Sequence, residues 1–597
     1  KAPQTPWVSS TRNEQVIIDL GEHHDDVTML YFCQVSYSNF SVAVSEDGES
    51  WSDDYIADMA EGECFQWKYL TPSYMGKDKY GNDKRFFYSQ PIKFSARYVR
   101  ITSQQIGLKM NEVIFHDANG DRIPATVIAQ LNVMEESTLY SDANNIFDEQ
   151  DTLEGLPSWW NSTYFDEIYH ARTAYEHLHG TAPYETSHPP LGKVIMSLGI
   201  AIFGMVPFGW RVMGALAGIL MLPAMYLLGK QLTKKSSFAF AAALMLALDC
   251  QHFTQTRIAT IDSYPVLFIL FSWLFMLRFM QRDIVRPPLK KLLPDLALSG
   301  LFMGLGIASK WIGVYSGAGL AVAFFWTIFR HMRMAATSAH LLKTDKNLSD
   351  EDRKILTLRD QTTMKRVLVI CLWCLLFFVA IPLAIYLLAY IPYFAYAHFD
   401  NLKDYLTAVW NAQLSMFSYH SKPGLGMDHP FYSPWYEWIF NQRPMYYASP
   451  AYVNTPGWSY AIWCFGNPAI WSAALVGFAY TVFMWAKRHR YTLRKDGETL
   501  HWTAADWDVT MPFLLLSALS QFLPWVLVPR GTYIYHYFAT TPFLMLSITV
   551  LFRDITRRFP KTGKWLLGIF LGVCLVMFVA YFPYASGTLT PTWWLDF

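Results

Sequence analysis

Ten apolar runs, each roughly 15 to 25 residues long, follow one another through the last two thirds of the chain. A helix needs about 20 mainly apolar residues to cross a bilayer, so these runs predict a polytopic α-helical membrane protein. Only 16% of the residues are charged, against roughly 25% in soluble proteins. We expect spans at 211–229, 236–253, 263–280, 295–310, 312–329, 367–390, 460–486, 511–528, 536–552 and 565–582.

Basic residues divide the loops between these runs into two alternating sets. One set holds 27 Lys and Arg residues and the other only five. Because positively charged loops stay on the cytoplasmic side, we predict that the poor set, residues 1–193 and the C-terminus face outward. The apolar stretch 194–207 would invert this arrangement if it crossed. It is short and is broken by Gly204 and Pro207, so we interpret it as an interfacial helix.

An exported N-terminal part needs a signal peptide or a preceding span. We therefore expect that a first transmembrane segment or a cleaved signal stood ahead of Lys1. Over the whole chain, Lys plus Arg equals Asp plus Glu at 48 each. This balance gives no general attraction for a polyanion, and it excludes a nucleic-acid-binding function.

Residues 14–125 alternate between apolar and polar positions, which is typical of half-buried strands. Asp47-Gly48 and Asn119-Gly120 are turns of the hairpin type. The runs IIDLGE, VSEDGESW, ARYVRIT and NEVIFHDANGDRI resemble the discoidin (coagulation-factor type C) jelly-roll family. That resemblance implies an extracytoplasmic module that binds sugars or lipid head groups, and a spacer without a ligand fits these residues equally well.

Three domains follow from these patterns. They are a β domain at 1–135, an outer loop with an acidic motif and interfacial helices at 136–210, and a transmembrane domain at 211–597 with a large outer loop at 391–458.

Four polar groups are predicted at the outer ends of the spans. Ionisable residues at such places are costly and are candidates for function. Taken singly, each is also explained by a solvated surface or by a side chain that reaches the lipid head groups. The four groups are YFDEIYH (164–170) with TSHPPLGK (186–193), ALD (247–249) with TRIATID (256–262), GIASKWIG (306–313), and LPW (523–525) with RGTYIYHYF (530–538).

Together with HPFYSPWYEWIFNQRPMYY (429–447) and FGNPAIW (465–471), these motifs resemble the polyprenyl-phosphate-mannose (dolichyl-phosphate-mannose) protein mannosyltransferases of the GT-C class. The resemblance runs in order from about residue 150 to 582. It implies eleven spans, so that the ten found here leave one to be supplied ahead of Lys1. The short loop 391–458 is similar to the bacterial members, whereas eukaryotic members carry β-trefoil repeats there.

The resemblance implies a role for each candidate residue. Asp166 would be the base that activates a Ser or Thr hydroxyl, and Glu167 would orient the acceptor loop. A single displacement would invert the anomeric centre of the sugar. His188 would shape the pocket near Asp166. The donor phosphate would be bound by Arg257, Lys310, Arg530, Tyr533 and His536.

A metal or a cofactor is not expected, because the lipid-linked sugar already carries a good leaving group. The sequence has no zinc spacing and no Gly-rich phosphate loop. Asp506-Trp507-Asp508 fits the Asp-x-Asp pattern of nucleotide-sugar enzymes, but we interpret it as the start of a helix on the cytoplasmic side.

Three alternatives stay open at this stage. The first is a GT-C transferase for another lipid-linked sugar, or for a glycan or lipid acceptor. The second is a transporter or flippase, although its charges would lie near the bilayer midplane. The third is a surface adhesin, for which a single span would suffice. The expected partners are a polyprenyl-phosphate-mannose donor, a secreted protein acceptor and membrane lipid.

Overall fold

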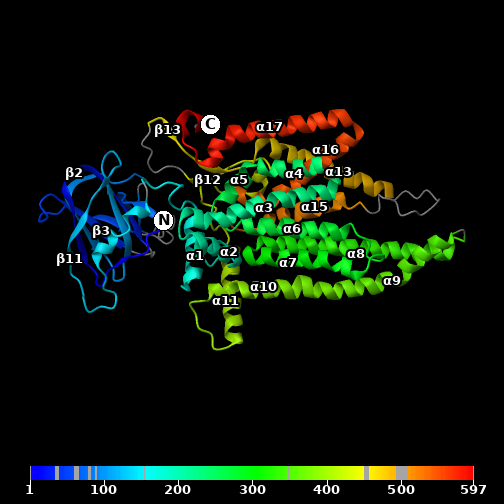
Figure 1. Ribbon diagram of the computed structural model, residues 1–597, viewed down its shortest axis with the longest axis horizontal. Helices are drawn as coiled ribbons and strands as arrows, with labels where there is room; N and C mark the ends of the chain where they lie inside the picture. The colour runs from blue at the N-terminus through cyan, green and yellow to red at the C-terminus, as the bar shows by residue number, and fades with distance from the viewer. Residues whose placement is uncertain are drawn as a thin grey trace.

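A β domain and a long helical bundle make up the computed structural model (Figure 1). The structure describes residues 2–33, 39–58, 66–77, 83–87, 90–153, 155–346, 348–448, 456–492 and 508–595. The β domain lies at one end of the bundle, which we call the site end because it also carries α1, α2 and α11. The fold class predicted from the sequence is confirmed.

The β domain is built around one long strand, β2 (Gln15–Cys33). The first part of β2 pairs with β8 (Phe94–Ser103) and β11 (Thr126–Leu131), and its last part pairs with β9 (Lys109–His116) and β5 (Trp67–Tyr69), all antiparallel. One face of β2 fills the core of the β domain, whereas Leu30 and Phe32 on its other face belong to the core of the bundle. The other strands are β1 (Trp7–Val8), β3 (Asn39–Ser45), β4 (Tyr55–Asp58), β6 (Ser73–Lys77), β7 (Asp83–Phe87) and β10 (Arg122–Ile123).

Both predicted turns lie between antiparallel strands. Asn119-Gly120 lies between β9 and β10, and Gly120 has a positive φ of 85°. Asp47-Gly48 lies in the longer connection between β3 and β4. The Asp47 carboxylate accepts hydrogen bonds there from the backbone N–H groups of Glu49 and Ser50. The likeness to discoidin domains stays a prediction.

The β domain is attached to the bundle by a backbone hydrogen bond and by a shared apolar core. At its beginning, the backbone N–H of Ala2 donates to the carbonyl of Met205, 2.9 Å away, between α2 and α3. Arg122, near its end, donates to the carbonyls of Gln150 (2.6 Å) and Leu153 (2.7 Å) in the segment that leads to α1. Leu30, Phe32, Trp67 and Ile114 of the domain belong to the same apolar core as the bundle.

Helices occur at all ten predicted spans. Among the described residues, seven helices are long and apolar enough to cross a membrane, so the chain is a multi-pass membrane protein. The helices α4 and α7 are apolar but shorter, and α16 is not one of the seven, so crossing by these three stays a prediction. The bounds are α1 Glu167–His179, α2 Leu191–Phe203, α3 Pro207–Thr233, α4 Ser236–Ala247, α5 Cys250–Arg257, α6 Ser263–Met280, α7 Leu293–Ser309, α8 Ile312–Thr344, α9 Asp350–Leu375, α10 Ile381–Tyr393, α11 Leu402–Ser421, α12 Trp435–Trp438, α13 Pro468–Thr492, α15 Thr510–Phe522, α16 Thr541–Arg558, α17 Pro560–Ser586 and α18 Thr592–Leu595.

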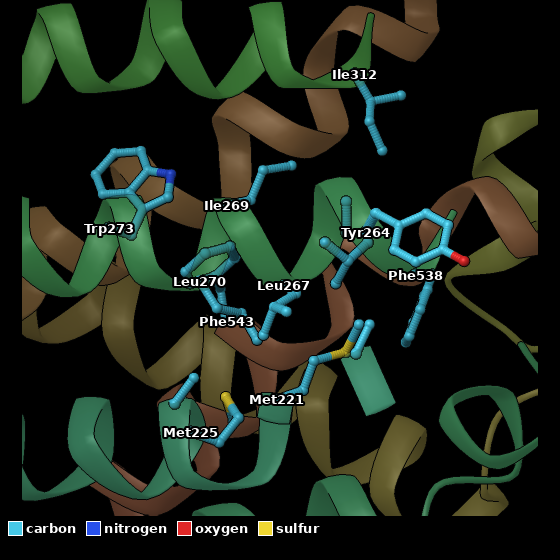
Figure 2. Packing of buried hydrophobic residues seen from close by; sticks show 14 of the residues in the cluster. Met221, Met225, Tyr264, Leu267, Ile269, Leu270, Trp273, Ile312, Phe538 and Phe543 are labelled. Carbon is cyan, nitrogen blue, oxygen red and sulfur yellow. The ribbon is translucent and has the colours of Figure 1, made fainter. Parts of the chain in front are cut away.

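The helix α6 lies at the centre of the bundle because it is apolar on every side. In Figure 2 its side chains Leu267 and Leu270 extend toward Met221 and Met225 of α3, while Trp273 lies farther along the same helix. The start of α6 follows directly on Asp262, so the packing of this helix fixes the position of that carboxylate at the site end.

The large loop 391–458 contains α11, which runs across the site end, at an angle to the bundle (Figure 1). Tyr405 donates to the carbonyl of Leu387, and Gln413 donates to the hydroxyl of Tyr390, so α11 rests on the last turns of α10. Its last turn brings His420 Nε2 to within 2.7 Å of the carbonyl of Ser187.

Short strand pairs tie this loop to the rest of the site end. They are β12 (Met445–Ala448) with β14 (Ile462–Cys464), and β13 (Trp458–Ser459) with β15 (Thr590–Pro591). Asp506 and Trp507 lie outside the described residues, and Asp508 accepts a hydrogen bond from the backbone of Thr510 at the start of α15.

Candidate active site

A sharp turn just before α1 presents two adjacent carboxylates to different surroundings. Phe165 has a φ of 50°, a left-handed conformation that is unusual for a bulky residue. Its ring stacks on Tyr447 with 4.3 Å between centroids and meets the edge of Tyr535 at 6.3 Å. These ring contacts hold the turn, and Asp166 and Glu167 follow it with separate environments.

Glu167 is fully buried and its hydrogen bonds are satisfied. It accepts from two nitrogens of Arg211, Nε and Nη2, each at 2.7 Å. It also accepts from the backbone N–H groups of Ala259 (3.0 Å) and Tyr164 (3.3 Å). Four donors occupy the acceptor sites of this carboxylate, so its role is structural. Glu167 therefore fixes the turn onto α3 and the segment before α6.

Asp166 is half-buried, and no hydrogen bond to its carboxylate is present among the described residues. Burial raises the pKa of Asp166 to about 7; Lys310 opposes this rise, and Asp262 and Glu185 reinforce it. A carboxyl group that titrates near neutral pH and is not engaged by donors suits general-base chemistry.

Lys310 is positioned by the tight connection between α7 and α8. Its Nζ lies 2.6 Å from Asp262 Oδ1 and 5.9 Å from the ring centroid of Tyr535. The residue is 7% exposed, so this ion pair lies in a largely dry site. Coulomb attraction is stronger in such a medium than in water.

Arg530 is a cation without an acidic partner among the residues that the structure describes. Its only hydrogen bond there goes to the carbonyl of Gly531, at 3.5 Å. Arg530 is partly buried, and it is close enough to Tyr533, Tyr535 and His536 for its charge to influence them. A guanidinium fork of this kind is suited to phosphate.

His536 lies buried beside these cations. Its Nδ1 lies 3.0 Å from the backbone nitrogen of Tyr533 and 3.1 Å from the carbonyl oxygen of the same residue. The Tyr533 ring stacks on Tyr535, and its hydroxyl donates to the carbonyl of Gly426.

His188 belongs to a cluster between α1 and α2. Its Nδ1 lies 3.0 Å from Glu185 Oε1, and Glu185 also pairs with the fully buried Lys193. Burial alone would raise the pKa of Glu185, but Lys193 and His188 hold it well below its usual range. The His188 ring meets that of His420 at 5.2 Å, so the cluster connects α2 to the end of α11.

Arg257 lies apart from the other predicted phosphate-binding residues. Its Nη2 donates to the carbonyl of Ser586 at 2.5 Å, and its guanidinium lies over the ring of Trp159. Its charge acts on Tyr164 and Arg211, whereas the charges that act on Asp166 are those of Lys310, Asp262 and Glu185. The structure thus brings Asp166, Lys310, Arg530, Tyr533, His536 and His188 to one region and places Arg257 in another.

Several residues at this site were not assigned a role from the sequence. The partner of Lys310, Asp262, was visible in the TRIATID motif, but its pairing depends on how α6 and α7 meet. Arg211 is the first residue of a predicted span. Glu185 has nearby partners, His188 and Lys193, and Tyr535 contacts the adjacent His536, but neither pattern indicates a role by itself. His420 carries no sequence signal, because its partner Ser187 is 233 residues away.

Comparisons with known proteins bear on the fold and the family of this chain. The family model for "dolichyl-phosphate-mannose-protein mannosyltransferase" matches residues 202–402, and that for the "C-terminal four TMM region of protein-O-mannosyltransferase" matches residues 405–593. A polyprenol-phosphate-mannose–protein mannosyltransferase of Mycolicibacterium smegmatis is 24% identical over 67% of this chain and 78% of its own length. One of Corynebacterium glutamicum is 24% identical over 68% and 78%.

Among solved structures, the Saccharomyces cerevisiae protein O-mannosyltransferase Pmt1–Pmt2 complex bound to the sugar donor matches with a TM-score of 0.56. The match is 12% identical and covers 72% of this chain and 87% of the yeast chain. It shows a shared GT-C fold. The two family models follow one another along the chain and together cover the helices from α3 to α17, and with the bacterial relatives they show that this chain belongs to the protein O-mannosyltransferase family.

Proposed function

We propose that this protein transfers mannose from a polyprenyl-phosphate donor to Ser or Thr hydroxyls of proteins, with Asp166 as the base. The observation that carries the proposal is the contrast between two neighbouring carboxylates. Glu167 accepts hydrogen bonds from four donors, whereas Asp166 accepts none from the described residues, and burial raises its pKa to about 7. Asp166 faces the region where Lys310 and Arg530 supply positive charge.

The reaction balances without a metal or a redox cofactor. The acceptor oxygen attacks C1 of the sugar while the bond from C1 to the phosphate oxygen breaks. The hydroxyl proton goes to Asp166, and the electron pair of the broken bond leaves with the polyprenyl phosphate. Attack opposite to the leaving phosphate inverts the anomeric centre.

The cations of the site would hold the phosphate as its charge grows. Arg530 and Lys310 supply charge-assisted hydrogen bonds, which strengthen where water is excluded. His536 Nε2 and the Tyr533 side chain complete this side of the site. His188 shapes the acceptor side through its contact with Glu185.

On the basis of the predicted topology, we place this reaction on the extracytoplasmic side of the membrane. The loops of the site end carry few basic residues, which supports an extracytoplasmic active site and β domain in a multi-pass membrane protein. The donor would enter from the lipid and the acceptor from the aqueous side. Mannosylation of a glycan or a lipid is the alternative that uses the same residues.

Acceptor identity is tested with purified enzyme in liposomes that contain labelled polyprenyl-phosphate-mannose. We expect the label on Ser or Thr of an added peptide, located by mass spectrometry. Label that appears on a glycolipid and never on the peptide would contradict the protein acceptor and leave the transferase chemistry intact.

Arg530→Gln should weaken donor use more than it slows the chemical step. Hydrogen bonds to charged groups contribute about 1.5–3 kcal/mol, so KM for the donor should rise on the order of ten- to a hundredfold. Arg443→Gln is the matched control, because Arg443 is exposed and paired with Glu437. An unchanged donor KM in Arg530→Gln would remove Arg530 from the phosphate site.

The pH profile should follow the ionisation of Asp166. The base must be deprotonated, and its pKa is raised to about 7. Below that pH, kcat/KM should fall about tenfold per unit, and above it kcat/KM should level off. Initial rates from about pH 5.5 to about pH 8.5 check this, since the phosphodiester of the donor stays ionised throughout. If kcat/KM stays constant below about pH 7, a group other than Asp166 takes the proton.

A further inference from the structure

A cavity of about 550 Å³ lies beside the turn that carries Asp166 and Glu167. Its walls are Trp159, Trp160 and Tyr164 of the segment before α1, the first turns of α3, and Arg257 at the end of α5. Cavities of this size hold small molecules or lipid head groups. The lining is apolar apart from Arg257 and Arg211.

The two arginines of this cavity differ in charge balance. Arg211 is neutralised by Glu167. Arg257 has no carboxylate within ion-pair distance in the part of the chain that the structure describes, although the charge of Glu167 acts on it from beyond that distance. Its neighbours are the side chain of Tyr164, the carbonyl of Ser586 and the rings of Trp159 and Phe253. An arginine has five N–H donors and stays charged at all relevant pH values. The cavity therefore offers one guanidinium that no carboxylate among the described residues pairs directly.

The cavity lies at the edge of the apolar part of the bundle. The helix α3, which forms one wall, is one of the seven helices able to cross a membrane. At its start Phe208 is 59% exposed, and Trp160 across the cavity is 72% exposed. Tryptophan is enriched where bilayers meet water, so the opening is at the level of lipid head groups.

We infer that this cavity binds the phosphate head of a lipid, at a site separate from the donor phosphate. Arg257 would hold the phosphate, and the aromatic walls would cover the start of the apolar chain. Glu167 and Arg211 stand between the two sites, because Glu167 bonds Arg211 of the cavity while Asp166 faces Lys310. The same head-group chemistry occurs in the polyprenyl phosphate product and in bulk anionic phospholipid.

Native mass spectrometry of the delipidated enzyme distinguishes these sources. We expect two bound molecules with undecaprenyl phosphate if the product fills the cavity. With undecaprenyl phosphate and phosphatidylglycerol together, one molecule of each is expected if phospholipid fills it. In either case Arg257→Gln should lose the second molecule, with its apparent Kd raised about tenfold or more. Arg443→Gln should retain both.

A filling variant keeps the test independent of the charge. Ala215→Trp narrows the cavity and leaves Arg257 in place, and Ile219→Trp is its control because Ile219 is 60% exposed one turn further along α3. Loss of the second lipid in Ala215→Trp alone supports the site.

Two outcomes would overturn the inference. The first is unchanged binding in both Arg257→Gln and Ala215→Trp. The second is equal occupancy by diacylglycerol, which has no phosphate. Arg530→Gln should lose only the first molecule, so a failure of the proposed donor site is seen separately from a failure of this one.

Discussion

Asp166→Asn is expected to lower kcat by about 10²–10⁴-fold, the usual contribution of a positioned general base. Asparagine keeps the shape of the side chain and cannot take the proton of the acceptor hydroxyl. The measurement is transfer of labelled mannose to a Ser/Thr peptide at saturating donor. Donor KM should change far less than kcat, because the proposed role of Asp166 is to take the acceptor proton and not to bind the donor phosphate.

The same variant should stay folded. Its carboxylate makes no hydrogen bond among the described residues, so its loss breaks nothing, and removing a buried charge relieves the cost of desolvation. The thermal unfolding midpoint should equal or exceed that of the unaltered protein. Asp404→Asn, at the exposed start of α11, is the matched control and should retain activity. Full activity in Asp166→Asn would defeat the mechanism.

Glu167→Gln is expected to act on stability instead of on proton transfer. It leaves Arg211 with its charge uncompensated, and breaking one side of a buried ion pair costs about 3–5 kcal/mol. The unfolding midpoint in detergent should fall clearly. It can be followed with a thiol-reactive dye, because Cys250, Cys464 and Cys574 are buried in the folded protein.

A double variant separates the ion pair from the backbone hydrogen bonds. Glu167→Gln with Arg211→Gln removes both charges, so it should recover part of the lost stability. A midpoint in the double variant below that of both single variants would show that the pair is not the main contribution. The activity of Glu167→Gln should fall only as far as the turn is displaced.

Much of the architecture followed from local patterns. The apolar runs were long enough to show the helices, and the alternation at residues 16–21, 40–45 and 97–101 showed strands that the structure contains. What was not predictable was how far β2 extends and that both halves of the domain share it. That depends on pairing with β9 and β11, which lie about a hundred residues away.

The candidate site was predicted in part. Asp166, Lys310, Arg530 and His536 meet because their motifs all lie at the same ends of helices, which a topology argument captures. Arg257 precedes Asp262 by only five residues, yet the two side chains lie on different sides of Glu167. The direction of a side chain at a helix end depends on packing against distant segments, here Ser586 and Trp159, and no spacing encodes it.

The double attachment of the β domain has a mechanical consequence. A module joined through one peptide link alone is free to change its orientation, whereas this one is held by the Ala2 hydrogen bond and by the apolar core that it shares with the bundle. The orientation of the β domain relative to the bundle is therefore fixed, and so is the distance from its loops to Asp166.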